Sequence, residues 1–111
     1  MVKYRIEIEN GKHPHPVVIT EEKKYELAGE FLLAEGRNFG REILAAMNEV
    51  CSGERQESGF SGNVFSLEIT RGQTRITHDI SDRTCEIGTE ALKKMLKEYL
   101  TVWQKQVKAE I

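Results

Sequence analysis

Two alternating runs separated by a glycine turn constrain the fold of this chain more than any other feature. In the first run, residues 64–70, every second residue is apolar, namely Phe65, Leu67 and Ile69. The second run, residues 74–80, places on one face Thr74, Ile76, His78 and Ile80. Alternation with period two is typical of a strand with one buried face. The runs therefore predict an antiparallel hairpin with Arg71 and Gly72 as its turn.

The turn sets the register of this hairpin. A two-residue turn of this kind requires a positive φ, which we expect at Gly72. Leu67 then lies opposite Ile76, so the apolar residues of both strands share one face. The same register places Glu68 opposite Arg75, an attractive pair across the strands.

A third strand and a long helix are predicted after the hairpin. Residues 83–87 fit a strand with Cys85 and Ile87 on its buried side, ended by Gly88. Thr89 is the expected N-cap, because its hydroxyl can accept a hydrogen bond from a free amide of the first turn. Apolar residues then recur at helical spacing: Leu92, Met95, Leu96, Tyr99, Val102, Trp103 and Val107. Lysines fall mostly off this stripe and predict a solvated face: Lys93, Lys94, Lys97, Lys105 and Lys108.

An alternating strand also begins the chain, with apolar residues at Val2, Tyr4, Ile6 and Ile8. Residues 10–11, Asn-Gly, are the favoured pair for a two-residue hairpin turn. That turn sets Tyr4 opposite Val17. Pro14 and Pro16 cannot donate to a strand ladder, so we expect their strand to lie at an edge or to begin near Val17.

Residues 21–36 fit either a helix or a strand. Their Glu, Lys, Leu and Ala favour a helix that Thr20 could cap. Period two, however, brings four apolar residues onto one face, whereas helical spacing spreads them around the circumference: Tyr25, Leu27, Phe31 and Leu33. We therefore favour a strand over residues 24–34 and keep the helix as the alternative.

A helix and a loop are predicted next. Asn38 is the expected N-cap of a helix that ends near Gly53 and has an apolar stripe of Phe39, Ile43, Ala46, Met47 and Val50. Residues 52–62 have the small and polar residues of a loop. Together these elements predict an α+β fold, a single domain of residues 1–111 in which an antiparallel sheet of about five to six strands has two helices packed on one face.

Composition limits the class of protein. The 111 residues are 39% hydrophobic and 31% charged, which fits one soluble domain. The net charge of −2 makes nucleic-acid binding an unfavourable hypothesis. No apolar run is long enough to cross a bilayer and the first residues lack a signal-peptide pattern, so we expect a cytoplasmic protein without a membrane partner. Cys51 and Cys85 are expected to be reduced and partly buried.

The chain has no recognisable catalytic motif. It has no phosphate-binding glycine loop, nucleophile elbow, HExxH or zinc-knuckle spacing. His13 and His15 share a strand face, and with His78 they could hold a metal ion in a small hydrolase. The interpretation that we favour is that His13 and His15 are surface residues and His78 is a hydrogen-bonded residue at the sheet margin. We therefore predict a non-enzymatic domain with no catalytic residues, cofactor or metal.

Binding of a protein partner is the remaining hypothesis. The candidate contacts are charged residues of the hairpin's outer face and of the loop before it: Glu54, Glu57, Glu68, Arg75 and Asp79. An acidic face would suit a basic partner, because opposite potentials steer association. The alternative is a homodimer formed through the long helix or an edge strand.

Part of the second half resembles a known class of proteins. The runs GNVFSLEI (residues 62–69), TRI (74–76) and CEIGTEAL (85–92) look like the strand-turn-strand-helix ending of small bacterial immunity proteins from contact-dependent and related toxin systems. The resemblance covers less than half of the chain and transfers no binding residues. It implies a cytoplasmic protein that binds a cognate toxin domain and blocks its active site.

Overall fold

The computed structural model describes residues 2–110 and the side chains of residues 2–105. In chain order the elements are β1 (Tyr4–Glu9), β2 (His15–Thr20), the 3-10 turn η1 (Lys23–Tyr25), α1 (Glu26–Phe31), the π-helical segment η2 (Leu32–Gly36), α2 (Arg37–Cys51), β3 (Glu57–Ser61), β4 (Phe65–Thr70), β5 (Gln73–His78), β6 (Thr84–Gly88) and α3 (Thr89–Glu110).

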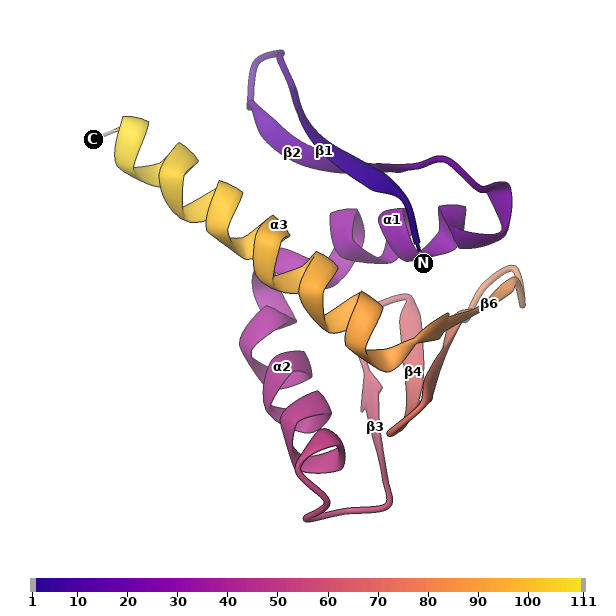
Figure 1. The fold of residues 1–111 in the computed structure, drawn as a ribbon. Helices are drawn as coiled ribbons and strands as arrows, with labels where there is room; N and C mark the ends of the chain where they lie inside the picture. The colour runs from indigo at the N-terminus through magenta and orange to yellow at the C-terminus, as the bar shows by residue number, and fades with distance from the viewer. Residues whose placement is uncertain (1, 111) are drawn as a thin grey trace.

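Helices α1 and α3 lie between two antiparallel sheets, and α2 packs beside the larger one (Figure 1). Within residues 2–110, the strands form a β1–β2 hairpin and a four-stranded sheet in the order β3-β4-β5-β6. Both α1 and α3 contact β2 as well as β5 and β6, whereas α2 contacts β3 and β4. The predicted α+β fold with antiparallel strands and packed helices is thus confirmed. The strands do not join one sheet, however, because β1–β2 packs across α1 and α3 instead of beside an edge of the larger sheet.

The register predicted for the β4–β5 hairpin is confirmed: Leu67 lies opposite Ile76, and Glu68 lies opposite Arg75. The positive φ predicted for Gly72 is wrong, because among the described glycines only Gly53 has one (φ 88°). The Thr70 hydroxyl closes the hairpin turn instead, donating to the carbonyl of Gln73 (2.7 Å) and accepting from its N–H (3.3 Å). Ile80, expected on the buried face, lies beyond the end of β5 and is 76% exposed.

The third strand and the last helix lie where the sequence predicts them. Cys85 and Ile87 are buried on β6, and the stripe of α3 buries Leu92, Met95, Leu96 and Tyr99. Thr89 does not cap α3 through its side chain, because its hydroxyl donates to the carbonyl of Thr70 (2.6 Å) and lies 2.8 Å from the hydroxyl oxygen of Thr74. This residue therefore attaches the start of α3 to the sheet. The predicted roles of the Val107 and Lys108 side chains lie outside the described side chains.

The strand favoured over residues 24–34 is wrong, because this segment is helical. Its buried side chains recur at helical spacing: Leu27, Ala28, Phe31, Leu32 and Glu35. They include the small Ala28 and the charged Glu35, which an apolar pattern does not contain. Leu33 is 49% exposed and does not belong to this face. The helical path continues without a break through η2 into α2, and α1 and α2 run in different directions (Figure 1). A π-helical turn shifts the phase and accounts for such a bend. Asn38 consequently lies within the helical path and not at an N-cap.

The β1–β2 hairpin forms with a register different from the predicted one. Tyr4 lies opposite Thr20 instead of Val17, because residues 10–14 form a longer loop than the predicted two-residue turn. This loop keeps the ring of Pro14 out of the strand ladder. On the other side, β2 lies against α1 so closely that a Cβ at Gly29 would be 2.6 Å from the carbonyl oxygen of Val18.

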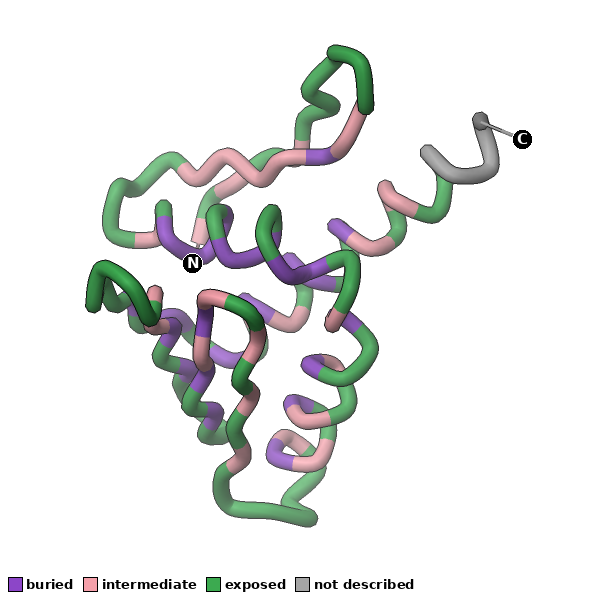
Figure 2. Tube along the Cα trace, turned by 180° about the vertical axis from the view of Figure 1, so that it is seen from behind, coloured by how far each residue is buried: buried purple, intermediate pink, exposed green. Residues whose placement is uncertain are grey.

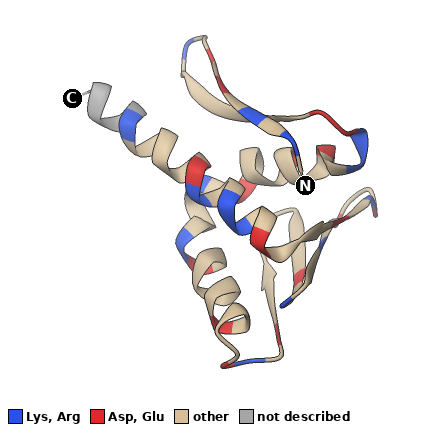
Figure 3. Ribbon diagram, viewed as in Figure 1, with Lys and Arg blue, Asp and Glu red and all other residues tan. Residues whose placement is uncertain are grey.

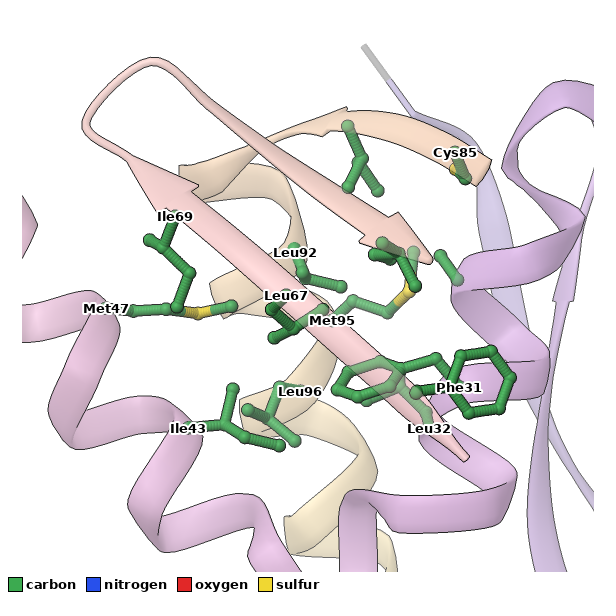
Figure 4. Packing of buried hydrophobic residues seen from close by; sticks show 14 of the residues in the cluster. Phe31, Leu32, Ile43, Met47, Leu67, Ile69, Cys85, Leu92, Met95 and Leu96 are labelled. Carbon is green, nitrogen blue, oxygen red and sulfur yellow. The ribbon is translucent and has the colours of Figure 1, made fainter. Parts of the chain in front are cut away.

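Residues 52–62 are not a loop throughout, because they contain β3, which pairs with β4 at an edge of the sheet. Phe60 on β3 packs against Phe39 of α2, with ring centres 5.4 Å apart. The main core lies between the helices and the inner face of the four-stranded sheet, where Met47 and Leu96 meet Leu67 (Figure 4).

Candidate functional site

The outer face of the four-stranded sheet carries three of the five residues predicted to contact a partner. We define the outer face as the strand residues on the side of the sheet that points away from the core: Glu57, Gly59, Ser61, Ser66, Glu68, Thr70, Gln73, Arg75, Thr77, Thr84, Glu86 and Gly88. Glu57, Glu68 and Arg75 are all exposed there. Ser66 and Thr77 are half-buried, and the other residues of the set are exposed as well. Solvent therefore reaches most of this face.

Acidic residues predominate among the charged groups of the outer face, with Glu57, Glu68 and Glu86 against Arg75. Figure 3 shows how acidic and basic residues are distributed along the ribbon. Arg75 lies between two carboxylates in one row across the strands, 2.8 Å from Glu86 and 3.7 Å from Glu68. Its pKa is raised by the hydrogen bond to Glu86 first, and then by the charges of Glu86 and Glu68. Glu57 lies beyond this row, near the end of the sheet formed by the β4–β5 turn. The three carboxylates outweigh the guanidinium, so the outer face is acidic.

The other two predicted contacts lie at opposite ends of this sheet. Asp79 follows β5, where its carboxylate accepts a hydrogen bond from the hydroxyl of Ser66 (2.9 Å). Since Ser66 belongs to the outer face, Asp79 extends that face at one end. Glu54 is exposed in the connection between α2 and β3, at the end nearer Glu57. The structure thus groups Glu57, Glu68 and Arg75 and places Glu54 and Asp79 at the margins.

A cleft between α2 and α3 is a second surface, which the sequence analysis did not find. We define the α2–α3 cleft, of about 840 Å³, by its lining residues: Arg37, Asn38, Arg41, Glu42, Leu100, Trp103 and Gln104. A smaller adjoining hollow of about 360 Å³ is lined by Lys12, His13, Pro14, His15, Leu33, Arg37 and Trp103. Arg37 and Trp103 border both hollows. The available signal was the four-residue spacing of Arg37 and Arg41, which places both on one side of a helix.

Arg37 stacks on Trp103, which was predicted to belong to the core. The guanidinium carbon lies 4.1 Å from the centre of the indole ring, a cation–π contact. Trp103 is only half-buried, although its indole nitrogen is shielded from solvent and has no acceptor among the described atoms. Beneath it, burial raises the pKa of Tyr99, and nearby Trp103 and Arg37 oppose that rise. Trp103 therefore forms the boundary between the core and the α2–α3 cleft.

The histidines do not form one site. The ring of His15 lies 2.9 Å from the backbone carbonyl of His13, near the start of β2. His78 lies at the margin of the other sheet, where its Nδ1 is 2.7 Å from the Ser81 hydroxyl and its ring packs edge-on against Phe65. This agrees with the interpretation of His78 as a hydrogen-bonded residue at the sheet margin. Within the described residues, no three His, Cys, Asp or Glu side chains are arranged to hold a metal ion.

Both cysteines are free thiols in environments that disfavour the thiolate. Cys51 is half-buried and Cys85 is buried on β6. Burial is the main cause that raises the pKa of each thiol. Cys85 also donates its S–H to the backbone carbonyl of Lys24 (3.2 Å). A raised pKa lowers the fraction of nucleophilic thiolate at neutral pH.

Glu35 is a buried charged residue that the sequence analysis missed. It is 1% exposed, and its carboxylate accepts hydrogen bonds from the backbone N–H groups of Asn63, Val64 and Phe65. Gly62 leaves room for this contact, because a Cβ there would overlap the carboxylate. Glu35 therefore fixes the β3–β4 turn to η2. Its carboxylate accepts hydrogen bonds within the protein and is not exposed to an external ligand.

No protein-family model, curated protein or solved structure matches this chain. None of the helices in residues 2–110 has the length and apolar character needed to cross a membrane.

Proposed function

We propose that this protein is a non-enzymatic protein-binding domain whose partner docks on the outer face of the four-stranded sheet. The observation that carries the proposal is the grouping of Glu57, Glu68 and Glu86 around Arg75 on a solvent-exposed face. The charges come from neighbouring strands of a hydrogen-bonded sheet, so their backbone positions are fixed before a partner arrives. Binding to a preorganised surface costs less conformational entropy than binding to a mobile one.

We further propose that the partner is a basic toxin domain, and that the protein acts in the cytoplasm as an immunity protein. The resemblance of residues 62–92 to immunity proteins supports this specific form, and the acidic outer face supplies a complementary charge. Opposite potentials accelerate encounter and disfavour other partners. An acidic surface that covers a basic catalytic groove would block access of the toxin's substrate.

Co-expression tests this proposal directly. Cells that produce a toxin encoded beside the gene are expected to survive when they also make this protein. The double variant Glu57→Lys/Glu68→Lys should lose that protection. Glu9→Lys/Glu21→Lys is the matched control, because it makes the same change of charge at exposed residues away from the four-stranded sheet. Equal killing with and without the wild-type protein would refute the immunity function, and full protection by Glu57→Lys/Glu68→Lys would refute the proposed face.

Self-association is the second candidate, and the edge position of β3 favours it. Edge strands can pair with a second copy through their outward backbone groups. β3 is short and begins with the charged Glu57, features that oppose such pairing. Size-exclusion chromatography distinguishes the two: a dimer that persists in Glu57→Lys/Glu68→Lys would favour self-association over a charged partner. The arrangement of the histidines gives no support to a metal-dependent hydrolase, because among the described residues His13, His15 and His78 do not share a site.

A further inference from the structure

We infer that the α2–α3 cleft is a second binding site, separate from the outer face, which takes an acidic peptide segment of another protein. The segment would place a carboxylate against Arg37 and Arg41 and an apolar side chain against Leu100. The lining of the cleft shares no residue with the outer face, and it comes from α2 and α3 instead of the strands. The site therefore goes beyond the proposed function.

The charge of the cleft selects an anionic occupant. Arg37 and Arg41 are exposed, and no described carboxylate forms an ion pair with either guanidinium. Four other arginines each hold a carboxylate in an ion pair, as Arg83 does with Glu30 at 2.9 Å: Arg5, Arg55, Arg75 and Arg83. Lys12 adds positive charge at the adjoining hollow, and Glu42 is the acidic member of the lining. A planar guanidinium binds a carboxylate through two parallel hydrogen bonds, which suits Asp or Glu side chains.

The apolar part of the cleft selects a peptide over a small anion. Leu100 and Trp103 are half-buried on α3, and Leu33 is 49% exposed at the adjoining hollow. Gly40 makes the approach of α2 to α3 possible, since a Cβ there would lie 2.8 Å from the methyl carbons of Leu100. A volume of about 840 Å³ lies within the range of ligand-binding clefts. Apolar walls beside charged groups match a segment that carries both kinds of side chain.

Two features favour a protein segment over a nucleic acid. The face of the Trp103 ring that could stack on a base is covered by Arg37. The positive charge also does not continue as an unbroken basic surface along α3, where Glu90 and Glu98 lie among the lysines Lys93, Lys94 and Lys97. Nucleic-acid binding relies on many phosphate contacts along a basic surface. Arg and Trp are, by contrast, enriched at the centres of protein interfaces.

Intrinsic fluorescence tests the inference, because Trp103 is the only tryptophan in the sequence. The probe is a synthetic peptide with blocked ends that alternates Glu and Leu. We expect a saturable change in the emission of the full-length protein and a weaker affinity at high salt, since exposed charges are screened. The same peptide with Lys in place of Glu should give no saturable change.

Variants locate the site. Arg37→Glu/Arg41→Glu is expected to weaken peptide binding at least about tenfold, the loss typical of a charge-assisted pair. Arg41→Glu alone avoids the stacked side chain and should weaken binding in the same direction if the double variant does not fold. Glu57→Lys/Glu68→Lys should bind the peptide as the wild type does, so failure of the outer-face proposal and failure of this one are distinguishable.

Other outcomes would overturn the inference. These are an acidic peptide that causes no saturable change, equal affinity in Arg41→Glu, or tighter binding of a single-stranded oligonucleotide than of the peptide. A change in emission that follows protein concentration without peptide would assign the cleft to a second copy of the chain and overturn it equally.

Discussion

One carboxylate oxygen of Glu35 lies 3.1 Å from the backbone nitrogen of Phe65 and accepts its hydrogen bond. The other oxygen accepts from the amides of Asn63 and Val64, so one side chain of the π-helical segment holds the whole turn between β3 and β4. A carboxylate inside a core is tolerated when backbone donors surround it in this way.

Replacing Glu35 is therefore expected to destabilise the protein strongly. Glu35→Ala leaves buried N–H groups without an acceptor, and we expect a loss of about 3 kcal/mol in the free energy of unfolding. Glu35→Gln keeps one acceptor oxygen and should lose less. Urea denaturation followed by circular dichroism measures both, with the exposed Glu42→Gln as control. A loss below about 0.5 kcal/mol for Glu35→Ala would contradict the described contact, since that is the usual range of surface substitutions.

Gly29 is expected to be essential for the contact between α1 and the β1–β2 hairpin. Alanine favours a helix over glycine by about 1 kcal/mol. At this residue, however, the added Cβ would meet the carbonyl oxygen of Val18 at 2.6 Å. We therefore expect Gly29→Ala to lower stability by about 1–3 kcal/mol, the range of overpacked cores. Thermal unfolding measures it, and a stabilised variant would show that α1 lies farther from β2.

Leu67→Ala tests the inner face of the four-stranded sheet. Leu67 is 2% exposed, and its truncation is expected to cost about 2–5 kcal/mol. Gly72→Ala is the comparison within the same hairpin: its φ is not positive and an added Cβ would contact nothing within 4 Å. We expect that change to stay within about 0.5 kcal/mol of the wild type in urea denaturation. Similar costs for the two variants would place Leu67 outside the core.

The hydrogen bond of Tyr4 should make the stability of the protein depend on pH in the alkaline range. Its hydroxyl donates to Glu98 at 2.5 Å, and its pKa is raised by burial first, then by that hydrogen bond and by the charge of Glu98. The unfolded chain releases this proton at about pH 10, whereas the folded protein retains it to higher pH. The contribution of Tyr4 is thus fully present below about pH 10 and is lost as the pH rises further.

The measurement compares Tyr4→Phe with the wild type across this range. At neutral pH, Tyr4→Phe should lower the free energy of unfolding by about 1 kcal/mol, the usual net value of one hydrogen bond. The difference in the free energy of unfolding should shrink as the pH rises above about 10. Glu98→Gln removes the carboxylate and should flatten the same dependence. A difference that grows with pH would reverse the assigned sign.

Local patterns were sufficient where strand alternation and a short turn agreed. Phe65, Leu67 and Ile69 are all buried, and the residues between them, Ser66 and Glu68, lie on the outer face, so the register and faces of the β4–β5 hairpin followed from the sequence. The same alternation explains why Glu68 and Arg75 could be placed on one exposed face. The spacing of Leu92 to Tyr99 likewise revealed the core side of α3.

Local patterns failed where tertiary contacts determine the structure. The buried side of residues 26–36 includes Glu35, which a search for regularly spaced apolar residues does not detect because its side chain is charged. The π-helical segment η2 also shifts the helical phase. β3 has few apolar residues because it is an edge strand with only Ser58 and Phe60 turned inward. In the α2–α3 cleft, Trp103 lies at the point where the apolar face of α3 extends beyond the core. Its contact with Arg37 depends on how α2 and α3, which are far apart in the sequence, pack against each other.

Because β1–β2 is separate from the larger sheet, we expect the hairpin to unfold locally on its own. An isolated two-stranded hairpin is marginal in water, and here α1 and α3 supply its support (Figure 2). Its backbone amides should exchange with deuterium faster than those of β4 and β5. Residues 12–15 of the hairpin also border the hollow beside Trp103. A peptide held there would slow exchange in β1 and β2, linking occupancy of the cleft to the order of the first strands.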